Sequence, residues 1–383
     1  MSKHEQMKKI IAAPLCLCAA VAMAQKPSEY NLDGKLYPQI NEDRSVTFQF
    51  SAPSARSVTL NLGRDYGMTK GERGMWTVTT DPQVVGFHYY SLKIGGLGVI
   101  DPAGQTFYGT SKYSSAIEVP ENESDAAFYT PRKDVPQGAV RSVRFHSDVC
   151  NEWRRMYVYT PAGYYDDPDR RYPVLYLQHG GGEDETGWIF QGRADVIMDN
   201  LIAEGKAEPM IIVMNSGYAS NPGSSDSFDA FEKMMTEEVI PFIDGRYRTI
   251  ADREHRAAAG LSWGAKQAYD LALGYPELFS AAGGFSGIIV VGEFNVHNPG
   301  IMDKTQRKAA YNGIFKDVKK FNKDYSLLFI STGQAEGTLL KEMSRTLKKD
   351  GIKNTYFESK DTAHEWLTWR RSLYNYAQLL FKK

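Results

Sequence analysis

The chain has 383 residues, which is too long for one average domain and suits two. Its 45 basic and 46 acidic residues nearly cancel, and its 42% hydrophobic and 12% aromatic residues are ordinary for a globular protein. Nothing in it is basic enough to follow a phosphate backbone, so nucleic acid is not expected as a partner.

The first 24 residues have the pattern of a secretory signal. Lys8 and Lys9 precede an apolar run, residues 10–22, and Ala22-Met23-Ala24 forms an A-x-A cleavage site. The run falls short of the roughly 20 residues that a membrane-spanning helix needs. We therefore expect cleavage after Ala24 and a secreted or periplasmic protein without a membrane span. Cleavage would leave Cys150 as the single cysteine and exclude an internal disulfide.

Residues 25–120 predict a small all-β domain. They show no helical period, but carry alternating or apolar-rich runs separated by turn-forming clusters. Short strands at this spacing are typical of an antiparallel sandwich. The expected strands are residues 46–50, 57–62, 75–78 and 87–92. The aromatics of this region could stack on sugar, or they could form the core of the sandwich: Trp76, Phe87, Tyr89 and Tyr90.

Residues 121–137 are polar and contain Pro131 and Pro136, which predicts an ordered or semi-extended linker. Residues 138–383 then alternate strand and helix patterns, which predicts a mostly parallel sheet with helices on both faces. The expected strands are residues 140–146, 155–160, 173–178, 210–215, 256–260, 281–285, 327–331 and 355–358, the first two as a hairpin. The expected helices include residues 195–204, 228–244, 339–349 and 364–381.

The strand at residues 256–260 leads into Gly260-Leu261-Ser262-Trp263-Gly264, and a helix is expected directly after it. A serine on such a sharp turn has a strained backbone, and the flanking glycines leave room for close approach. The turn presents the serine Oγ at the carboxyl end of the sheet and directs the next N–H, that of Trp263, at a developing oxyanion. We predict that Ser262 is a nucleophile. The alternative is a glycine-rich turn with a solvent-facing serine.

A serine nucleophile needs a base, and the base needs an acid that orients it. In a sheet of this kind both lie on loops after strands, in the chain order Ser, acid, His. His364 follows the last expected strand and is the predicted base. Glu336 follows the preceding strand and is the favoured acid, with Asp361 as its rival.

The loop after residues 173–178 reads His179-Gly180-Gly181-Gly182, which matches the HGGG type that supplies a second oxyanion donor. We expect Gly181 to donate beside Trp263 and Gly180 to lie against the substrate. His179 is expected to shape the loop rather than to act as a second base. The sequence contains neither a metal-ligand motif nor a phosphate loop, so no metal and no cofactor is expected.

Residues 138–383 resemble the esterase D-type α/β-hydrolases, specifically carbohydrate esterases of family one, which include feruloyl and acetyl-xylan esterases. The resemblance is carried by residues 153–161, 176–182, 259–264 and 363–370. Residues 76–90 resemble the immunoglobulin-like early-set domains that precede such catalytic domains. Together they imply an α/β-hydrolase preceded by a small immunoglobulin-like sandwich. Many relatives have Met, Gly and Asp where Trp263, Ala265 and Glu336 stand.

The resemblance implies a serine esterase that removes acyl groups, with feruloyl expected, from plant xylan or arabinoxylan. The alternatives are an acetyl-xylan or other short-chain esterase and a non-catalytic glycan-binding protein. Trp188, Trp263 and Trp366 stand beside the three proposed loops and could sandwich a feruloyl ring. Alternatively, Trp366 packs the final helix onto the sheet and Trp263 fills the pocket. The loop at residues 286–303, with Phe294 and His297, is a candidate lid.

Overall fold

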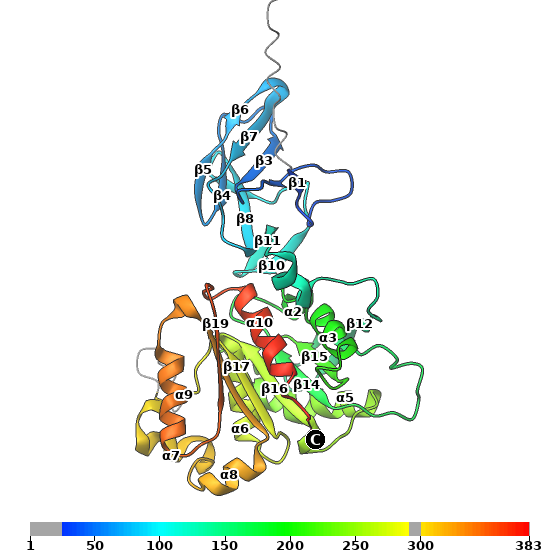
Figure 1. The fold of residues 1–383 in the computed structure, drawn as a ribbon, viewed down its shortest axis with the longest axis vertical. Helices are drawn as coiled ribbons and strands as arrows, with labels where there is room; N and C mark the ends of the chain where they lie inside the picture. Colours follow the sequence, from blue (N-terminus) through cyan, green and yellow to red (C-terminus); the bar gives the residue numbers. More distant parts are fainter. Residues whose placement is uncertain (1–24, 291–299, 383) are drawn as a thin grey trace, which may run out of the picture.

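The computed structural model describes residues 25–290 and 300–382 of the chain. The predicted signal, residues 1–24, lies outside the described residues, as do Phe294 and His297 of the predicted lid. Figure 1 shows an elongated molecule, in which an N-terminal body built of strands stands above a larger body of strands and helices. None of the helices in the described ranges is long and apolar enough to cross a membrane.

The N-terminal body, which we call the sandwich (residues 26–119), consists of two antiparallel sheets, as its runs predict. Side chains of β4 alternate between buried and half-buried positions, which is the period of a strand with one face on a core. The first sheet has the order β1-β2-β3-β7-β6, and the second has the order β10-β11-β8-β4-β5, with β9 paired to β8. The strands are β1 Lys26–Pro27, β2 Gln39–Ile40, β3 Val46–Ser51, β4 Val58–Leu62, β5 Arg64–Gly67, β6 Thr69–Lys70, β7 Met75–Thr79, β8 Gly86–Ile94, β9 Leu97–Val99, β10 Thr106–Gly109 and β11 Lys112–Val119.

The aromatic side chains of the sandwich are used in packing. Trp76 and Tyr90 are buried in the core between the two sheets. Phe87 and Tyr89 belong to the apolar cluster that joins the sandwich to the larger body. None of these four side chains is exposed, so of the two interpretations the core interpretation holds.

The predicted linker is folded against the larger body. It forms α1 (Glu123–Ala126) and a turn of 3₁₀ helix, Ala127–Tyr129. The Asn200 side-chain amide donates to the carbonyls of Ala127, Phe128 and Thr130, which satisfies three backbone acceptors of this segment. The segment is therefore ordered by contacts along its length.

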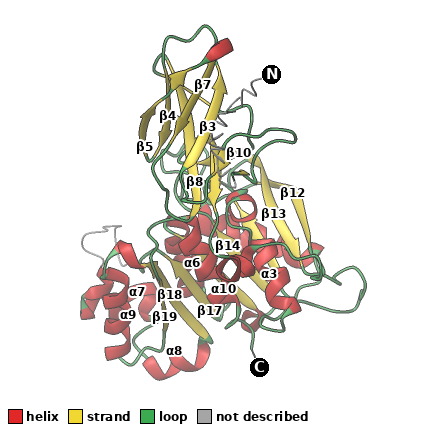
Figure 2. Ribbon diagram, turned by 45° about the horizontal axis from the view of Figure 1, so that its top comes forward, coloured by secondary structure: helices red, strands yellow, loops and turns green. Residues whose placement is uncertain are grey.

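The larger body, which we call the α/β part (residues 139–382), contains one sheet with the order β12-β13-β15-β14-β16-β17-β18-β19. The pairs that involve β13 are antiparallel and all others are parallel, so the predicted mostly parallel sheet is confirmed. Figure 2 shows β12 and β13 as long strands at one edge. The strands are β12 Ala139–Ser147, β13 Glu152–Thr160, β14 Val174–Gln178, β15 Ile211–Asn215, β16 Arg256–Leu261, β17 Ala281–Phe285, β18 Leu327–Gly333 and β19 Thr355–Ser359.

Helices cover both faces of this sheet, as predicted. One face packs against α2 (Gly187–Phe190), α3 (Ala194–Ala203) and α10 (Trp366–Ala377). The other packs against α4 (Phe231–Met234), α5 (Ile240–Arg246), α6 (Trp263–Gly274), α7 (Lys304–Gly313), α8 (Val318–Asp324) and α9 (Leu339–Lys349). The helix predicted at residues 228–244 begins three residues later than expected, at Phe231. Within it, a π-helical turn, Met235–Val239, joins α4 to α5.

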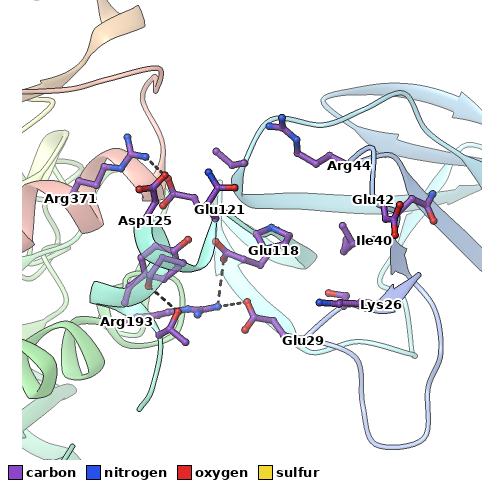
Figure 3. Close-up of a pocket in the computed structure, with 18 of the residues that line it drawn as sticks. Lys26, Glu29, Ile40, Glu42, Arg44, Glu118, Glu121, Asp125, Arg193 and Arg371 are labelled. Atoms are coloured by element: carbon purple, nitrogen blue, oxygen red, sulfur yellow. Dashed lines mark hydrogen bonds and ion pairs between the residues drawn. The ribbon is translucent and has the colours of Figure 1, made fainter. Parts of the chain in front are cut away.

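The sandwich and the α/β part are joined by a buried ion pair between β11 and α10. Arg370, which is 0% exposed, donates to Glu118 at 2.7 Å and also to the Gln191 carbonyl. Burial opposes the charge of Glu118, but Arg370, together with Arg193 and a hydrogen bond from Tyr30, outweighs this effect and lowers the pKa of the carboxyl. A charged cleft of about 1150 Å³ lies beside this pair, with Glu29 and Arg193 in contact across it (Figure 3).

Candidate active site

Ser262 lies between β16 and α6, at the carboxyl edge of the sheet. Its φ of 53° and ψ of −117° are strained for a residue with a side chain. The turn is tight, as the space at its glycines shows. A Cβ on Gly260 would lie 2.3 Å from the Gly264 carbonyl oxygen. A Cβ on Gly264 would lie 2.2 Å from the His179 carbonyl oxygen. Both flanking glycines are therefore required by close packing of the strand, the helix and the glycine loop.

Three side chains from three loops form one hydrogen-bonded chain. His364 Nε2 lies 3.0 Å from Ser262 Oγ, and His364 Nδ1 lies 2.7 Å from Glu336 Oε2. Glu336 follows β18, and His364 precedes α10. This geometry allows the imidazole to take the hydroxyl proton while the carboxylate fixes its tautomer and orientation.

The rival acid lies elsewhere. The side chain of Asp361 is mostly exposed, and its nearest charged partner is Lys360, at 3.8 Å. The backbone N–H of Asp361 donates to the Gln334 side chain, which turns this residue toward the loop after β18. Glu336, and not Asp361, is within hydrogen-bond distance of the His364 ring.

Ser286 and Trp369 hold Glu336 in place and were not foreseen from the sequence. The Ser286 hydroxyl donates to Glu336 Oε1 at 2.6 Å, and the Trp369 indole N–H donates to the Ser286 hydroxyl. Burial disfavours the charge of Glu336, but hydrogen bonds from His364, Ser286 and the Gly333 N–H outweigh it and lower the pKa of the carboxyl. Ser286 directly follows β17, and that position at the carboxyl end of a parallel strand was the available signal.

The glycine loop lies against the Ser262 turn. A Cβ on Gly180 would lie 3.4 Å from Ser262 Cβ, and one on Gly181 would lie 3.9 Å from Trp263 Cβ. The Gly180 N–H donates to the buried carboxyl of Glu183, whereas Gly181 is exposed. Gly181 is therefore better placed than Gly180 to donate to a substrate carbonyl.

His179 shapes this loop, as expected. Its Nε2 accepts from the Gly217 N–H at 2.9 Å, so Nδ1 carries the proton and donates to the Gly180 carbonyl. Burial lowers the pKa of His179, which keeps the imidazole neutral. Both ring nitrogens are engaged in the loop, which leaves neither to act as a base.

An aromatic wall stands on one side of Ser262. The ring of Trp263 contacts Phe228 at a centroid distance of 4.7 Å, and Phe228 stacks on Tyr218 at 5.1 Å. The sequence predicted a helix that begins at Phe228, and this start is wrong. Helix α4 begins at Phe231, and Phe228 lies in the preceding turn, where its ring packs between Trp263 and Tyr218.

Trp188 and Trp366 lie in the core and not on a surface. They are 1% and 2% exposed, and their rings pack edge to face at 5.5 Å. The indole N–H of Trp188 donates to the Gln178 carbonyl, which anchors α2 under the sheet edge. Both side chains are buried next to the loops that carry the proposed catalytic residues. The prediction that they contact the acyl group is therefore dropped. Among the described residues, no cluster of His, Cys, Asp or Glu could hold a metal ion.

Comparison with known proteins agrees with this arrangement. The Esterase family model ("Putative esterase") matches residues 147–378. The chain belongs to the Esterase family. An endo-1,4-β-xylanase/feruloyl esterase from Xylanibacter ruminicola is 38% identical over 369 residues, which covers 93% of this chain and 47% of that protein. The chain thus spans about half the length of this curated relative, or less in the case of others.

Solved structures of esterases share the fold. A family-one ferulic acid esterase from Anaeromyces mucronatus superposes with a TM-score of 0.56 at 24% identity, covering 67% of this chain and 95% of that one. The enterochelin esterase of Shigella flexneri has a TM-score of 0.61 at 15% identity and covers 88% of this chain and 91% of that one. The α/β-hydrolase fold of this Esterase family member is thereby established.

Proposed function

We propose that the protein is a serine carboxylesterase in which Ser262 is the nucleophile, His364 is the general base and Glu336 orients the base. The observation that carries the proposal is the unbroken chain from Ser262 Oγ to His364 at 3.0 Å and from His364 to Glu336 at 2.7 Å. The strained backbone of Ser262 supports it, since strain of this kind accumulates at functional sites.

In the proposed reaction His364 takes the proton of Ser262 as Oγ attacks the ester carbonyl. The backbone N–H groups of Trp263 and Gly181 stabilise the oxyanion, and the position of Trp263 at the start of α6 adds the positive end of the helix dipole. His364 then protonates the leaving alcohol, and an acyl group remains on Ser262. A water molecule, deprotonated by His364, releases the acid and restores the serine.

The proposed substrate is a feruloyl ester of plant xylan or arabinoxylan. Two observations support it: the relative at 38% identity is a xylanase/feruloyl esterase, and the aromatic wall of Trp263, Phe228 and Tyr218 lies beside the proposed nucleophile. A flat ring can gain roughly 0.5–1.5 kcal/mol for each aromatic contact beyond simple burial, whereas an acetyl group offers only a methyl. We also propose that residues 1–24 direct export, so that the protein is secreted or periplasmic and can reach such polysaccharide.

The test compares kcat/KM for feruloylated and acetylated arabinoxylan oligosaccharides, together with methyl ferulate and a short-chain chromogenic ester. We expect hydrolysis of the feruloyl esters to be favoured, and the Ser262→Ala protein to be inactive on all four substrates. A clear preference for acetyl esters would overturn the acyl assignment. Activity retained by the Ser262→Ala protein would overturn the catalytic assignment.

A further inference from the structure

The hairpin of β12 and β13 projects past the edge of the sheet at which Ser262 lies. Met156 of β13 pairs with Asn215, the last residue of β15, so residues 152–155 extend beyond the carboxyl end of that parallel strand. The turn of the hairpin contains Asn151, with a φ of 53°. Trp153, two residues after this turn, therefore stands at the catalytic edge of the sheet.

Trp153 is 72% exposed, although the other tryptophans of the described residues are buried or half-buried. A single exposed apolar side chain needs no explanation by itself. Trp153, however, forms one side of a pocket of about 470 Å³. Its ring packs edge to face with that of His146, at a centroid distance of 5.6 Å, on the same hairpin. The remaining lining is polar: Arg144, Glu152, Arg154, Arg155, Glu185, Ser216 and Tyr218.

This pocket shares a wall with the catalytic loops. The buried guanidinium of Arg154 donates to the carbonyls of Ser216 and Tyr218, which ties the hairpin to the loop after β15. The Tyr218 hydroxyl accepts from the Gly182 N–H at 2.5 Å, and its ring stacks on Phe228. Tyr218 therefore separates the Trp153 pocket from the proposed acyl site by the width of one side chain.

We propose that the Trp153 pocket is a subsite for the sugar chain that carries the ester, with one pyranose ring stacked on the Trp153 indole. The inference rests on the proposed function and adds the place of the polysaccharide. The pocket holds charges of both signs, such as the Arg155–Glu185 ion pair at 2.6 Å, which disfavours a charged ligand of either sign. A neutral sugar fits because its C–H face covers an indole while its hydroxyls can both donate and accept.

The experiment uses full-length protein and two esters of the same acid, methyl ferulate and a feruloylated arabinoxylan oligosaccharide. Trp153→Ala should lower kcat/KM for the oligosaccharide roughly three- to tenfold through KM, and should leave methyl ferulate unchanged. Trp153→Phe should recover most of the loss. The matched control is Tyr165→Ala, because Tyr165 is also an exposed ring, but packs on Arg141 toward the other end of the hairpin. It should match the parent on both esters.

Equal losses on both esters, or no loss on either, would overturn the subsite. A parent protein that hydrolysed none of the esters would instead refute the proposed function. The subsite would then be decided by calorimetric binding of xylo-oligosaccharide to the Ser262→Ala protein, which Trp153→Ala should weaken to the same extent. Unchanged binding in that comparison would overturn it.

Discussion

The backbone N–H of Ser111 donates to the carbonyl of Gly182 at 2.8 Å, so the sandwich touches the glycine loop of the proposed active site. Ser111 and Thr110 form the two-residue turn between β10 and β11, and both have positive φ, at 63° and 54°. Turns of this type favour Asn and Gly, and a β-branched residue there is strained. The contact suggests that the sandwich holds the glycine loop in position.

We expect Ser111→Pro to lower kcat for methyl ferulate several-fold. Proline removes the N–H that reaches Gly182 and cannot adopt a φ of 63°. Ser111→Gly is the matched control, because glycine keeps the N–H and suits this φ, and it should stay within about twofold of the parent. Thermal unfolding of both proteins checks that the sandwich remains folded. Equal activity of the two variants would show that the turn does not support the loop.

The Glu118–Arg370 pair should dominate the stability of the junction. Glu118→Gln leaves Arg370 buried without its counter-charge, and the free energy of unfolding should fall by about 3–5 kcal/mol, as for other broken buried pairs. Asp65→Asn breaks the exposed pair with Lys93 and should cost less than about 1 kcal/mol. Urea unfolding measures both changes, and comparable losses would contradict this account of the junction.

Replacing Glu336 should reduce kcat less than replacing Ser262 does, but far more than replacing Asp361 does. Glu336→Ala should lower kcat on the order of 10²- to 10⁴-fold, since an orienting acid is the most expendable member of a triad. Asp361→Ala should remain within about twofold, because its side chain is exposed and Glu336 already occupies the hydrogen bond to His364 Nδ1. Steady-state kinetics on one soluble ester decide between them. A larger loss for Asp361→Ala would mean that the acid is misassigned.

Glu183 should make stability depend on pH. Burial raises the pKa of this carboxyl from 4.5 to about 8, with Asp184 adding to the effect, although the Gly180 N–H opposes it. Between these values the folded protein keeps a proton that the unfolded chain has lost. The free energy of unfolding should therefore fall as the pH rises from 4.5 to 8, by roughly 1.4 kcal/mol per pH unit from this group.

Glu183→Gln should remove that part of the slope, because the amide stays neutral at every pH. Urea unfolding of parent and variant at pH 5, 6, 7 and 8 gives the difference. Identical slopes would show that Glu183 is ionised in the folded protein. Gln can still accept from the Gly180 N–H, so the variant should retain the loop and most of its activity.

Much of the α/β part could be predicted because its buried strands are continuous apolar runs between helical periods. The eight predicted strands of the sheet all form. Helix α7 was missed because its sequence is polar, and because its backbone leaves helical geometry at Ala310, Tyr311 and Asn312. Strands β5 and β9 of the sandwich were missed because they are short and largely exposed, so they lack the alternation that marks a strand. Strand β11 was also missed, although it is eight residues long and mostly buried.

The members of the proposed triad could be selected from the sequence because their type and their position after strands restrict the choice. The direction in which each aromatic side chain points could not be predicted in this way. Trp188 and Trp366 adjoin the loops in sequence, yet their side chains turn into the core. Phe228, which was expected to begin a helix, lies before that helix and turns toward Trp263. Neighbours along the chain define which loop a side chain belongs to, but packing decides which way it points.

The central claim is that Ser262 is the nucleophile and is activated by His364. Labelling with a fluorophosphonate probe, followed by mass spectrometry of the modified peptide, tests it most directly. We expect one label per protein, on Ser262, greatly slowed labelling of the His364→Ala protein, and none of the Ser262→Ala protein. Full labelling of the Ser262→Ala protein, with its fold intact, would contradict the claim.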